Sequence, residues 1–316
     1  MSDEKKSKSE YAQMAKEQEE SVLDAIKKVK VDDLLSKSYT EIDSYVDMVA
    51  FGISNGCIIE GKGGVGKTWR VLNRLNTKGK DFAFFNSYTT PLAFYSFLYK
   101  NKDRDVLVID DVAKLFTDNT LLNFLKNALW DSVNEKRIVN YGTSKPISDD
   151  EVGVIPRMFE LNAKIIIIAN YINQKNPDVK AVLSRVNHCR VEIKKDELIK
   201  ILEQVAKKNY DGLSEIERME VFNYLKRKSD ETLIDLNIRT LIRAFQFKRF
   251  SKQVKNDELW TVLLSKNLKV DDRAEIVKTL VADKSFASEE DRAKKFEDLT
   301  GLGRATYFNL KKKFEI

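Results

Sequence analysis

Short, continuously apolar runs alternate with stretches of helical spacing between residues 57 and 193. The apolar runs are CIIE (57–60), FAFFN (82–86), VLVID (106–110), IIIIAN (165–170) and RVEI (190–193). Helical spacing lies between them, from Lys67 to about Leu75, after Pro91, over 117–134 and after Pro177. Runs that are apolar on both faces are typical of parallel strands covered by helices on both sides. The pattern therefore predicts a doubly wound parallel α/β sheet.

The rest of the chain predicts an insertion and two helical regions. Between residues 136 and 163, the β-rich flanks RIVNY and RMFEL surround a polar tip, which predicts a hairpin-like insertion. Helical spacing over 33–53 leads into the sheet, and helical spacing returns from residue 195 onward. The predicted domains are a charged tail and helix at 1–34, an α/β domain at 35–194, a helical lid at 195–250 and a C-terminal helical domain at 251–316.

The N-terminal segment is charged and lacks the apolar core of a signal peptide. Apolar residues at helical spacing over 10–30 fit a docking or coiled-coil helix, and they fit equally a loosely attached charged helix. No later apolar run approaches the roughly 18 residues of a membrane-spanning helix. We therefore expect a cytoplasmic protein with no membrane partner.

Composition narrows the class of protein without naming a function. The chain has 316 residues, of which 33% are charged and only 4 are proline, which suits a helix-rich globular protein with more than one domain. Cys57 and Cys189 fall inside predicted buried strands, so we expect reduced packing residues and no disulfide framework. The net charge of +6 permits a polyanionic partner.

The loop after the first apolar run, GKGGVGKT, has the spacing of a phosphate-binding P-loop. Its glycines allow backbone N–H groups to point at phosphates, and the helix that follows adds its positive dipole end. Lys67 is expected to reach the β- and γ-phosphates of ATP, and Thr68 to ligate Mg²⁺. The expected nucleotide contacts are Gly61, Gly63, Gly64, Val65, Gly66, Lys67, Thr68 and Trp69, although Trp69 also fits simple packing.

The sequence of this loop also fits a second type of P-loop. Lys62 to Thr68 also spell the lysine-bearing P-loop variant of partition and division-site ATPases, in which the extra lysine reaches a partner's phosphates. Lys62 distinguishes the two templates, because it is a variable loop residue in the first and a functional residue in the second.

Asp110 and Asp111 end the apolar run VLVID, at the edge of a parallel sheet where ligands bind. We expect Asp110 to hold Mg²⁺, directly or through water, and Asp111 to orient or deprotonate the attacking water. A polar turn after a strand is the plainer explanation of two adjacent aspartates, and the neighbouring P-loop argues against it.

The order of these motifs resembles the AAA+ superfamily of ATPases. A full strand and helix, FAFFN and PLAFYSFLYK, separate the P-loop helix from VLVIDD, as expected when another strand is inserted between the P-loop and Mg²⁺-binding strands. The VIDD ending is similar to the replication initiator and helicase-loader group and to related phage or plasmid ATPases. The resemblance covers about residues 35–250.

The resemblance implies three further site residues. Asn170 stands at the position of sensor 1, which helps to place the lytic water, and Arg185 at that of the arginine finger, which acts on a neighbour's ATP. Arg239 resembles sensor 2, the arginine of the lid that senses the γ-phosphate. Each also fits a plainer role, as a strand cap, a surface arginine or a helix-face charge.

The C-terminus predicts a helix, a glycine-containing turn and a second helix, similar to a helix-turn-helix. On a helical wheel the second helix gathers Arg304, Phe308, Lys311 and Lys312 on the face opposite Tyr307, as DNA contact would require. A solvated amphipathic hairpin is the alternative.

Lys145, at the tip of the insertion, is a second candidate for nucleic-acid contact or an ordinary surface lysine. We assign His188 no role.

These features together predict a Mg²⁺-dependent AAA+ ATPase that acts as a homo-oligomer, a hexameric ring or filament, on DNA. The leading expectation is a replication initiator or helicase loader, with a replicative helicase or another replication protein as partner. The alternatives are a ring-shaped DNA helicase or translocase, a protein-remodelling AAA+ ATPase and a partition-type ATPase.

Overall fold

The computed structural model describes residues 36–86, 89–130, 136–231, 236–268, 273–283, 285–286 and 288–313. The predicted charged tail and helix at 1–34 lie outside these residues. The chain divides into two compact units, Met1–Ile193 and Lys194–Ile316. Among the described residues, none of the helices combines the length and the apolar character needed to span a membrane.

The first unit contains the predicted parallel sheet, and its five strands have the order β2-β3-β8-β1-β9. The strands are β1 (Gly56–Gly61), β2 (Phe82–Phe85), β3 (Val106–Asp110), β8 (Lys164–Ala169) and β9 (Asn187–Val191). The three central strands are buried along nearly their whole length, which explains why their sequences are continuously apolar. The last strand begins at Asn187, three residues before the predicted RVEI run, because its polar first residues pair with β1.

The strand that lies between the P-loop strand and the VLVID strand is β8. Its residue Ile167 is paired with Ile58 of β1 on one side and with Ile109 of β3 on the other. FAFFN, which separates β1 and β3 along the sequence, forms the edge strand β2 instead. The predicted inserted strand therefore exists, but it comes from the segment after the insertion at 136–163.

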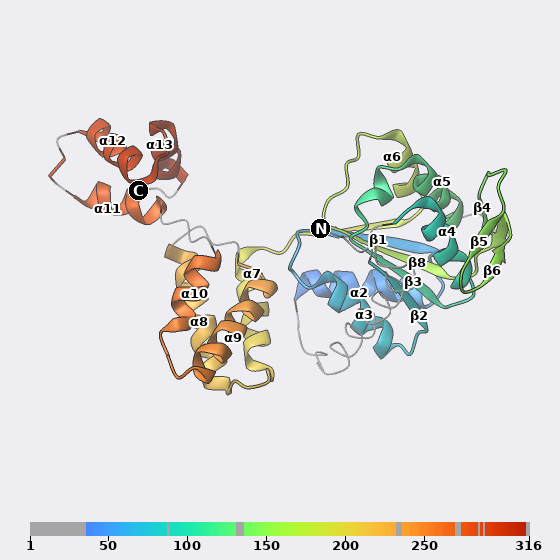
Figure 1. Ribbon diagram of the computed structural model, residues 1–316, viewed down its shortest axis with the longest axis horizontal. Helices are drawn as coiled ribbons and strands as arrows, with labels where there is room; N and C mark the ends of the chain where they lie inside the picture. Colours follow the sequence, from blue (N-terminus) through green and yellow to red (C-terminus); the bar gives the residue numbers. More distant parts are fainter. Residues whose placement is uncertain are drawn as a thin grey trace, which may run out of the picture. The chain divides into compact units, whose positions relative to one another are not determined.

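Helices cover both faces of the sheet, which gives three layers (Figure 1). One face carries α2 (Lys37–Ala50) and α3 (Lys67–Thr77), and the other carries α4 (Pro91–Lys100), α5 (Asn119–Ala128) and α6 (Pro177–Leu183). Side-chain caps at Ser36, Thr90, Asp118 and Asn176 start four of these helices. The helix predicted over 117–134 is shorter, because a 3₁₀ turn, η1 (Ala113–Phe116), precedes α5 and α5 ends at Ala128.

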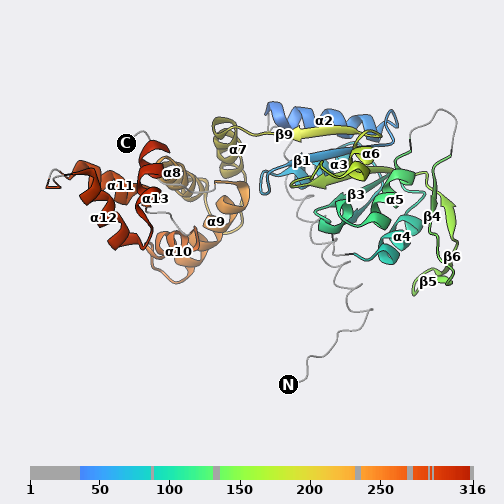
Figure 2. The ribbon, with the colours of Figure 1, turned by 90° about the horizontal axis from the view of Figure 1, so that it is seen from above.

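The insertion is a pair of nested two-stranded ladders at one end of the unit (Figure 2). The predicted flanks pair as β4 (Ile138–Asn140) and β7 (Met158–Glu160), and the tip forms β5 (Ile147–Asp149) with β6 (Gly153–Ile155). Val139 and Phe159 face inward, where Phe159 packs against Tyr95 with ring centroids 5.1 Å apart. The predicted hairpin-like insertion is confirmed, and its core is aromatic.

Both cysteines are buried free thiols in adjacent strands, as predicted. Burial raises the pKa of the Cys189 thiol from 9.0 to about 11 and raises the pKa of the Cys57 thiol further. The folded protein therefore keeps these protons as pH rises through the ordinary thiol range, and its stability falls as pH approaches 11.

We expect both thiols to resist iodoacetamide at pH 8.5 in the native protein and to react fully in guanidinium chloride. Mass spectrometry of the alkylated protein measures this. Rapid alkylation of the native chain would contradict the buried positions of Cys57 and Cys189.

In the second unit, four helices share one core. They are α7 (Lys195–Lys207), α8 (Glu215–Glu231), α9 (Ile238–Gln253) and α10 (Leu259–Leu268). Trp260 and Leu264 of α10 belong to the same cluster as Leu241 and Phe245 of α9. The predicted boundary at 250/251 is therefore misplaced: it falls inside α9, and α10 packs with the helices assigned to the lid.

The C-terminal helices form a second, smaller cluster. They are α11 (Arg273–Ala282), α12 (Glu289–Thr300) and α13 (Arg304–Lys313), packed around Phe296 and Tyr307. Gly301 ends α12 with φ 68°, a left-handed conformation that glycine adopts without strain. The predicted helix, glycine turn and helix at this end of the chain are confirmed.

Candidate functional site

The P-loop connects β1 to α3 at the carboxyl edge of the sheet. Gly64 and Gly66 have φ of 80° and 83°, which L side chains rarely adopt, so the loop can turn sharply before the helix begins at Lys67. Val65 is buried, Trp69 is half-buried and Lys62 is exposed. This strand, loop and helix are the context that a phosphate-binding loop requires.

The ammonium group of Lys67 lies over the loop. Its Nζ is 2.6 Å from the carbonyl oxygen of Gly61 and 2.8 Å from that of Lys62. A third bond, of 3.3 Å, reaches Oδ1 of Asn170 at the end of β8. Lys67 is 5% exposed, and a buried ammonium group at the loop is well suited to bind an anion.

Thr68 and Asp110 form the second contact across the edge. The Thr68 hydroxyl donates to Oδ2 of Asp110 over 2.7 Å, which joins the first turn of α3 to the end of β3. The Thr68 hydroxyl and the Asp110 carboxylate are neighbouring oxygen ligands of the kind that Mg²⁺ prefers. This ion usually takes one or two protein ligands and completes its coordination shell with water and phosphate oxygens. These two residues would hold the ion.

Asn170 joins Lys67 to Asp111. Its Nδ2 donates to Oδ1 of Asp111 over 2.9 Å, while its Oδ1 accepts from Lys67. Asp111 has φ 51°, a left-handed conformation that aspartate tolerates better than most residues. The backbone N–H of Asp111 still donates to the Ile168 carbonyl of β8, and its carboxylate meets the Asn170 amide. The carboxylate is exposed and available to a water molecule.

A cavity of about 310 Å³ opens beside Asp111 and Asn170. Its other walls are mainly apolar and come from η1 and from the end of β8 and the loop after it. Leu115, Phe116 and Tyr171 are among the residues that line it. The exposed carboxylate therefore borders a space that can hold water or a group from another molecule.

Arg185 lies between α6 and β9, and its contacts among the described residues lie away from the P-loop of its own chain. Its Nη1 donates to the carbonyl of Ala181, and its guanidinium stacks over Trp130 with 5.4 Å between Cζ and the ring centroid. Nε of Arg185 is buried with no hydrogen-bond partner among the described residues. The guanidinium is therefore held in place by the Trp130 ring and the Ala181 carbonyl.

Of the predicted DNA contacts, Lys145 is exposed at the turn between β4 and β5, and Arg304, Phe308 and Lys312 are exposed on α13. Lys311 differs, because its ammonium pairs with Glu289 of α12 over 2.8 Å. Glu289 also accepts from the hydroxyl of buried Tyr307, so Lys311 sits at the border of the core. Arg239 is exposed on α9 of the second unit.

Two contacts at this edge were missed by the sequence analysis. Glu60, the residue before the P-loop, accepts from the backbone N–H of Ile172 over 2.9 Å and lies 2.9 Å from Nε2 of His188. Glu60 thereby fixes the segment that follows Asn170. A carboxylate ending an apolar strand was the signal available. The second contact, from Tyr39 to the P-loop, had no local signal.

Comparisons with known proteins give a distant relative and several weak structural likenesses. No protein-family model matches the chain. An uncharacterized 36.7 kDa protein from the nrdC-mobD intergenic region of Enterobacteria phage T4 is 26% identical over 248 residues, which are 69% of this chain and 74% of the relative.

The structural likenesses include the RuvB Holliday junction branch migration motor of Thermotoga maritima, 13% identical, with a TM-score of 0.43 over 90% of this chain and 89% of that one. A DNA replication initiation factor is 14% identical, with a TM-score of 0.45 over 90% and 85% of the two chains. These TM-scores are too low to support an argument about this chain. Its fold class is therefore judged from its own strand order and from the residues at the carboxyl edge of its sheet. This chain resembles the AAA+ ATPases in three features. They are the strand order β2-β3-β8-β1-β9, the P-loop and acidic pair at the carboxyl edge of the sheet, and the helical unit that follows.

Proposed function

We propose that the chain is a Mg²⁺-dependent ATPase that works as an oligomer on DNA. The observation that carries the proposal is the hydrogen-bonded series from Lys67 through Asn170 to Asp111, with the pair of Thr68 and Asp110 beside it. A phosphate-binding cation, a magnesium-type ligand pair and an exposed carboxylate at one sheet edge are the parts that phosphoryl transfer to water needs.

Each side chain has a distinct task in hydrolysis. The loop N–H groups and Lys67 bind the phosphates. Thr68 and Asp110 would hold Mg²⁺, which would neutralise developing charge. Asp111 accepts the proton of the attacking water or orients it, and Asn170 holds the Asp111 carboxylate in place. Trp69, half-buried on the first turn of α3, packs beside the bound nucleotide.

Arg185 supports an oligomeric enzyme. A half-buried guanidinium held in place by Trp130 and Ala181 suits an arginine that stabilises transition-state charge on a neighbouring subunit's ATP. The active form is then a homo-oligomer, a hexameric ring or a filament, with its sites between subunits. Arg239 senses the γ-phosphate from the helical unit of the same subunit.

The exposed side chains of α13 support DNA as the substrate that is remodelled. Arg304 and Lys312 supply phosphate contacts and Phe308 an exposed ring, at 43% exposure, for a base or sugar. Lys145 adds a contact from the insertion. The proposed role is that of a cytoplasmic replication initiator or helicase loader, with a replicative helicase or another replication protein as partner. A ring helicase and a protein remodeller remain the competing proposals.

Paired measurements of DNA binding and ATP turnover test this function. We expect Arg304→Glu/Lys312→Glu to weaken DNA binding by roughly tenfold or more, and wild-type affinity to fall steeply as salt rises, because phosphate contacts release counterions. Lys266→Glu/Lys278→Glu, on other helices of the second unit, is the matched control. Unchanged DNA binding by the α13 variant would remove this surface from the proposal. ATP turnover that does not respond to DNA would favour the protein-remodelling ATPase. Separation of the strands of a forked duplex would favour the helicase.

A further inference from the structure

A tyrosine from the helix before the sheet is bonded to the backbone of the P-loop. The hydroxyl of Tyr39, on α2, donates to the carbonyl oxygen of Val65 over 2.8 Å. The Tyr39 side chain is fully buried, and a buried tyrosine hydroxyl needs such a partner. The bond joins residues 26 positions apart in the chain, so it is tertiary and independent of the loop's own sequence.

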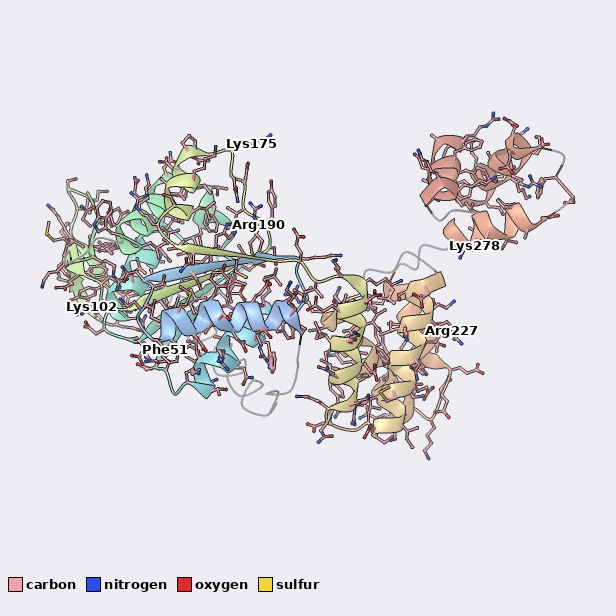
Figure 3. All side chains as sticks on the ribbon, turned by 180° about the vertical axis from the view of Figure 1, so that it is seen from behind. Phe51, Lys102, Lys175, Arg190, Arg227 and Lys278 are labelled. Carbon is pink, nitrogen blue, oxygen red and sulfur yellow. The ribbon has the colours of Figure 1, made fainter. Side chains whose placement is uncertain are left out.

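Two ion pairs fix α2 in place along α3. Arg70 bonds to both carboxylate oxygens of Asp43, with 2.7 Å from Nε to Oδ1, and Arg74 bonds in the same way to Asp47, with 2.8 Å. The two aspartates are one turn apart on α2 and the two arginines are one turn apart on α3. The paired contacts therefore oppose sliding of one helix along the other. Figure 3 shows α2 along one face of the first unit, with Phe51 just beyond its carboxyl end.

The Tyr39 ring is held within this same contact. The guanidinium of Arg70 lies 5.5 Å from the ring centroid, and the Arg70 and Asp43 side chains are 11% and 12% exposed. A bidentate pair in such a position is rigid, because breaking it leaves a charge largely removed from water. The hydroxyl of Tyr39 is therefore presented to the P-loop from a fixed support.

The bond sets the orientation of one peptide group in the loop. The peptide that joins Val65 to Gly66 is planar and trans, so its C=O and N–H point in opposite directions. Holding the carbonyl toward Tyr39 holds the Gly66 N–H away from it. Gly64 and Gly66 are both at positive φ, and glycine allows a peptide to rotate at little cost, so this group requires an external restraint.

We infer that Tyr39 is a positioning residue for phosphate binding, which acts by fixing the Val65–Gly66 peptide with its N–H turned toward the phosphates. The inference rests on the proposed nucleotide site and adds a residue that lies outside every motif of that site. Tyr39 acts on the phosphates through the loop and does not contact the base, so its effect is the same for any ligand with the same phosphate chain.

Tyr39→Phe tests the inference, because it removes the hydroxyl and keeps the ring. The probes are Mg²⁺-ATP and Mg²⁺-tripolyphosphate, titrated by calorimetry. We expect both dissociation constants to rise by the same factor, roughly threefold to tenfold, as loss of one hydrogen bond implies. KM for ATP rises with kcat nearly unchanged. The melting temperature without ligand falls by no more than a few degrees, as loss of about 1 kcal/mol implies. Tyr45→Phe is the control: Tyr45 is on the same helix, and its hydroxyl makes no hydrogen bond to any described residue.

The outcomes separate the inference from the proposed function. If wild type binds neither ATP nor tripolyphosphate, the proposed function fails. If wild type binds both and Tyr39→Phe binds them equally well, the inference is overturned. A loss confined to ATP also overturns it, because Tyr39 would then act on the base or sugar. If Tyr39→Phe does not fold, Asp47→Ala replaces it; the same joint rise is expected from loosening α2, and unchanged affinities contradict the inference.

Discussion

Replacing Lys67 with alanine is expected to reduce ATP turnover by roughly 10² to 10⁴-fold. The Lys67 ammonium is the buried cation of the P-loop, 2.6 Å and 2.8 Å from two loop carbonyls that neighbour the phosphate position. A hydrogen bond to a charged group contributes about 1.5–3 kcal/mol, and Lys67 would lose its bonds to two phosphates. A loss of about 3–6 kcal/mol in transition-state binding corresponds to this range of rates.

Lys62→Ala is the matched control, because it removes the other lysine of the same loop. The Lys62 side chain is exposed, so we expect turnover within about twofold of wild type. Phosphate release under steady-state conditions measures both variants, and circular dichroism verifies their folding. Loss of turnover in Lys62→Ala together with normal turnover in Arg185→Ala would indicate a partition-type ATPase and contradict the proposed assignment.

Arg185→Ala is expected to lower kcat by roughly 10³ to 10⁵-fold, the range found for arginine fingers. The affinity for ATP should remain within a few-fold of wild type, because Arg185 contacts Ala181 and Trp130 rather than the P-loop of its own chain. A substitution that removes an interaction made only in the transition state lowers kcat and kcat/KM by the same factor, because binding of the substrate is unchanged.

Arg104→Ala controls for the loss of an arginine from the same unit. Arg104 precedes β3, at the edge of the sheet opposite the P-loop, and pairs with Asp81 on the surface. Such a pair contributes at most about 1 kcal/mol to stability, so turnover should be unchanged. Equal turnover of Arg185→Ala and Arg104→Ala would rule out Arg185 as the finger.

The sequence was informative wherever a short pattern decides the local structure. The apolar run before GKGGVGKT made β1 and its loop predictable, because a strand, a glycine turn and a helix start follow one another directly. The flanks RIVNY and RMFEL predicted the ladder of β4 and β7, since strands joined by a short insertion usually pair. The placement of Asp110 and Asp111 at the carboxyl edge followed from the end of an apolar run.

Long-range pairing was the part that periodicity could not supply. The pattern shows that β8 is a buried strand, but its position between β1 and β3 depends on crossovers that leave no local signature. Lys311 lies on the basic face of a helical wheel, yet Glu289 of another helix binds it. In the same way, α10 follows a charged segment and still packs on α9, because Trp260 fills the shared core.

The contacts of Glu60 and Tyr39 were also beyond local pattern. Glu60 directly precedes the P-loop, and a carboxylate that ends an apolar strand marks it as a candidate polar contact. Its partner, the N–H of Ile172, is 112 positions away and could not be predicted from its neighbours. Tyr39 occupies an apolar position of an amphipathic helix, where a core role suffices to explain it. Only the folded chain shows its hydroxyl at the Val65 carbonyl.

The central claim is an ATP-hydrolysing site completed by a neighbouring subunit, and mixing two inactive variants tests it most directly. Asp111→Asn retains the arginine finger and, because asparagine also tolerates a positive φ, the local backbone, but it lacks the carboxylate. Arg185→Ala retains the carboxylate but lacks the finger. ATP turnover is measured for each variant alone and for mixtures across all ratios. We predict that each variant alone is inactive and that the mixtures regain turnover, highest near equal proportions; mixtures that stay inactive at every ratio, while wild type hydrolyses ATP, would contradict a site shared between subunits.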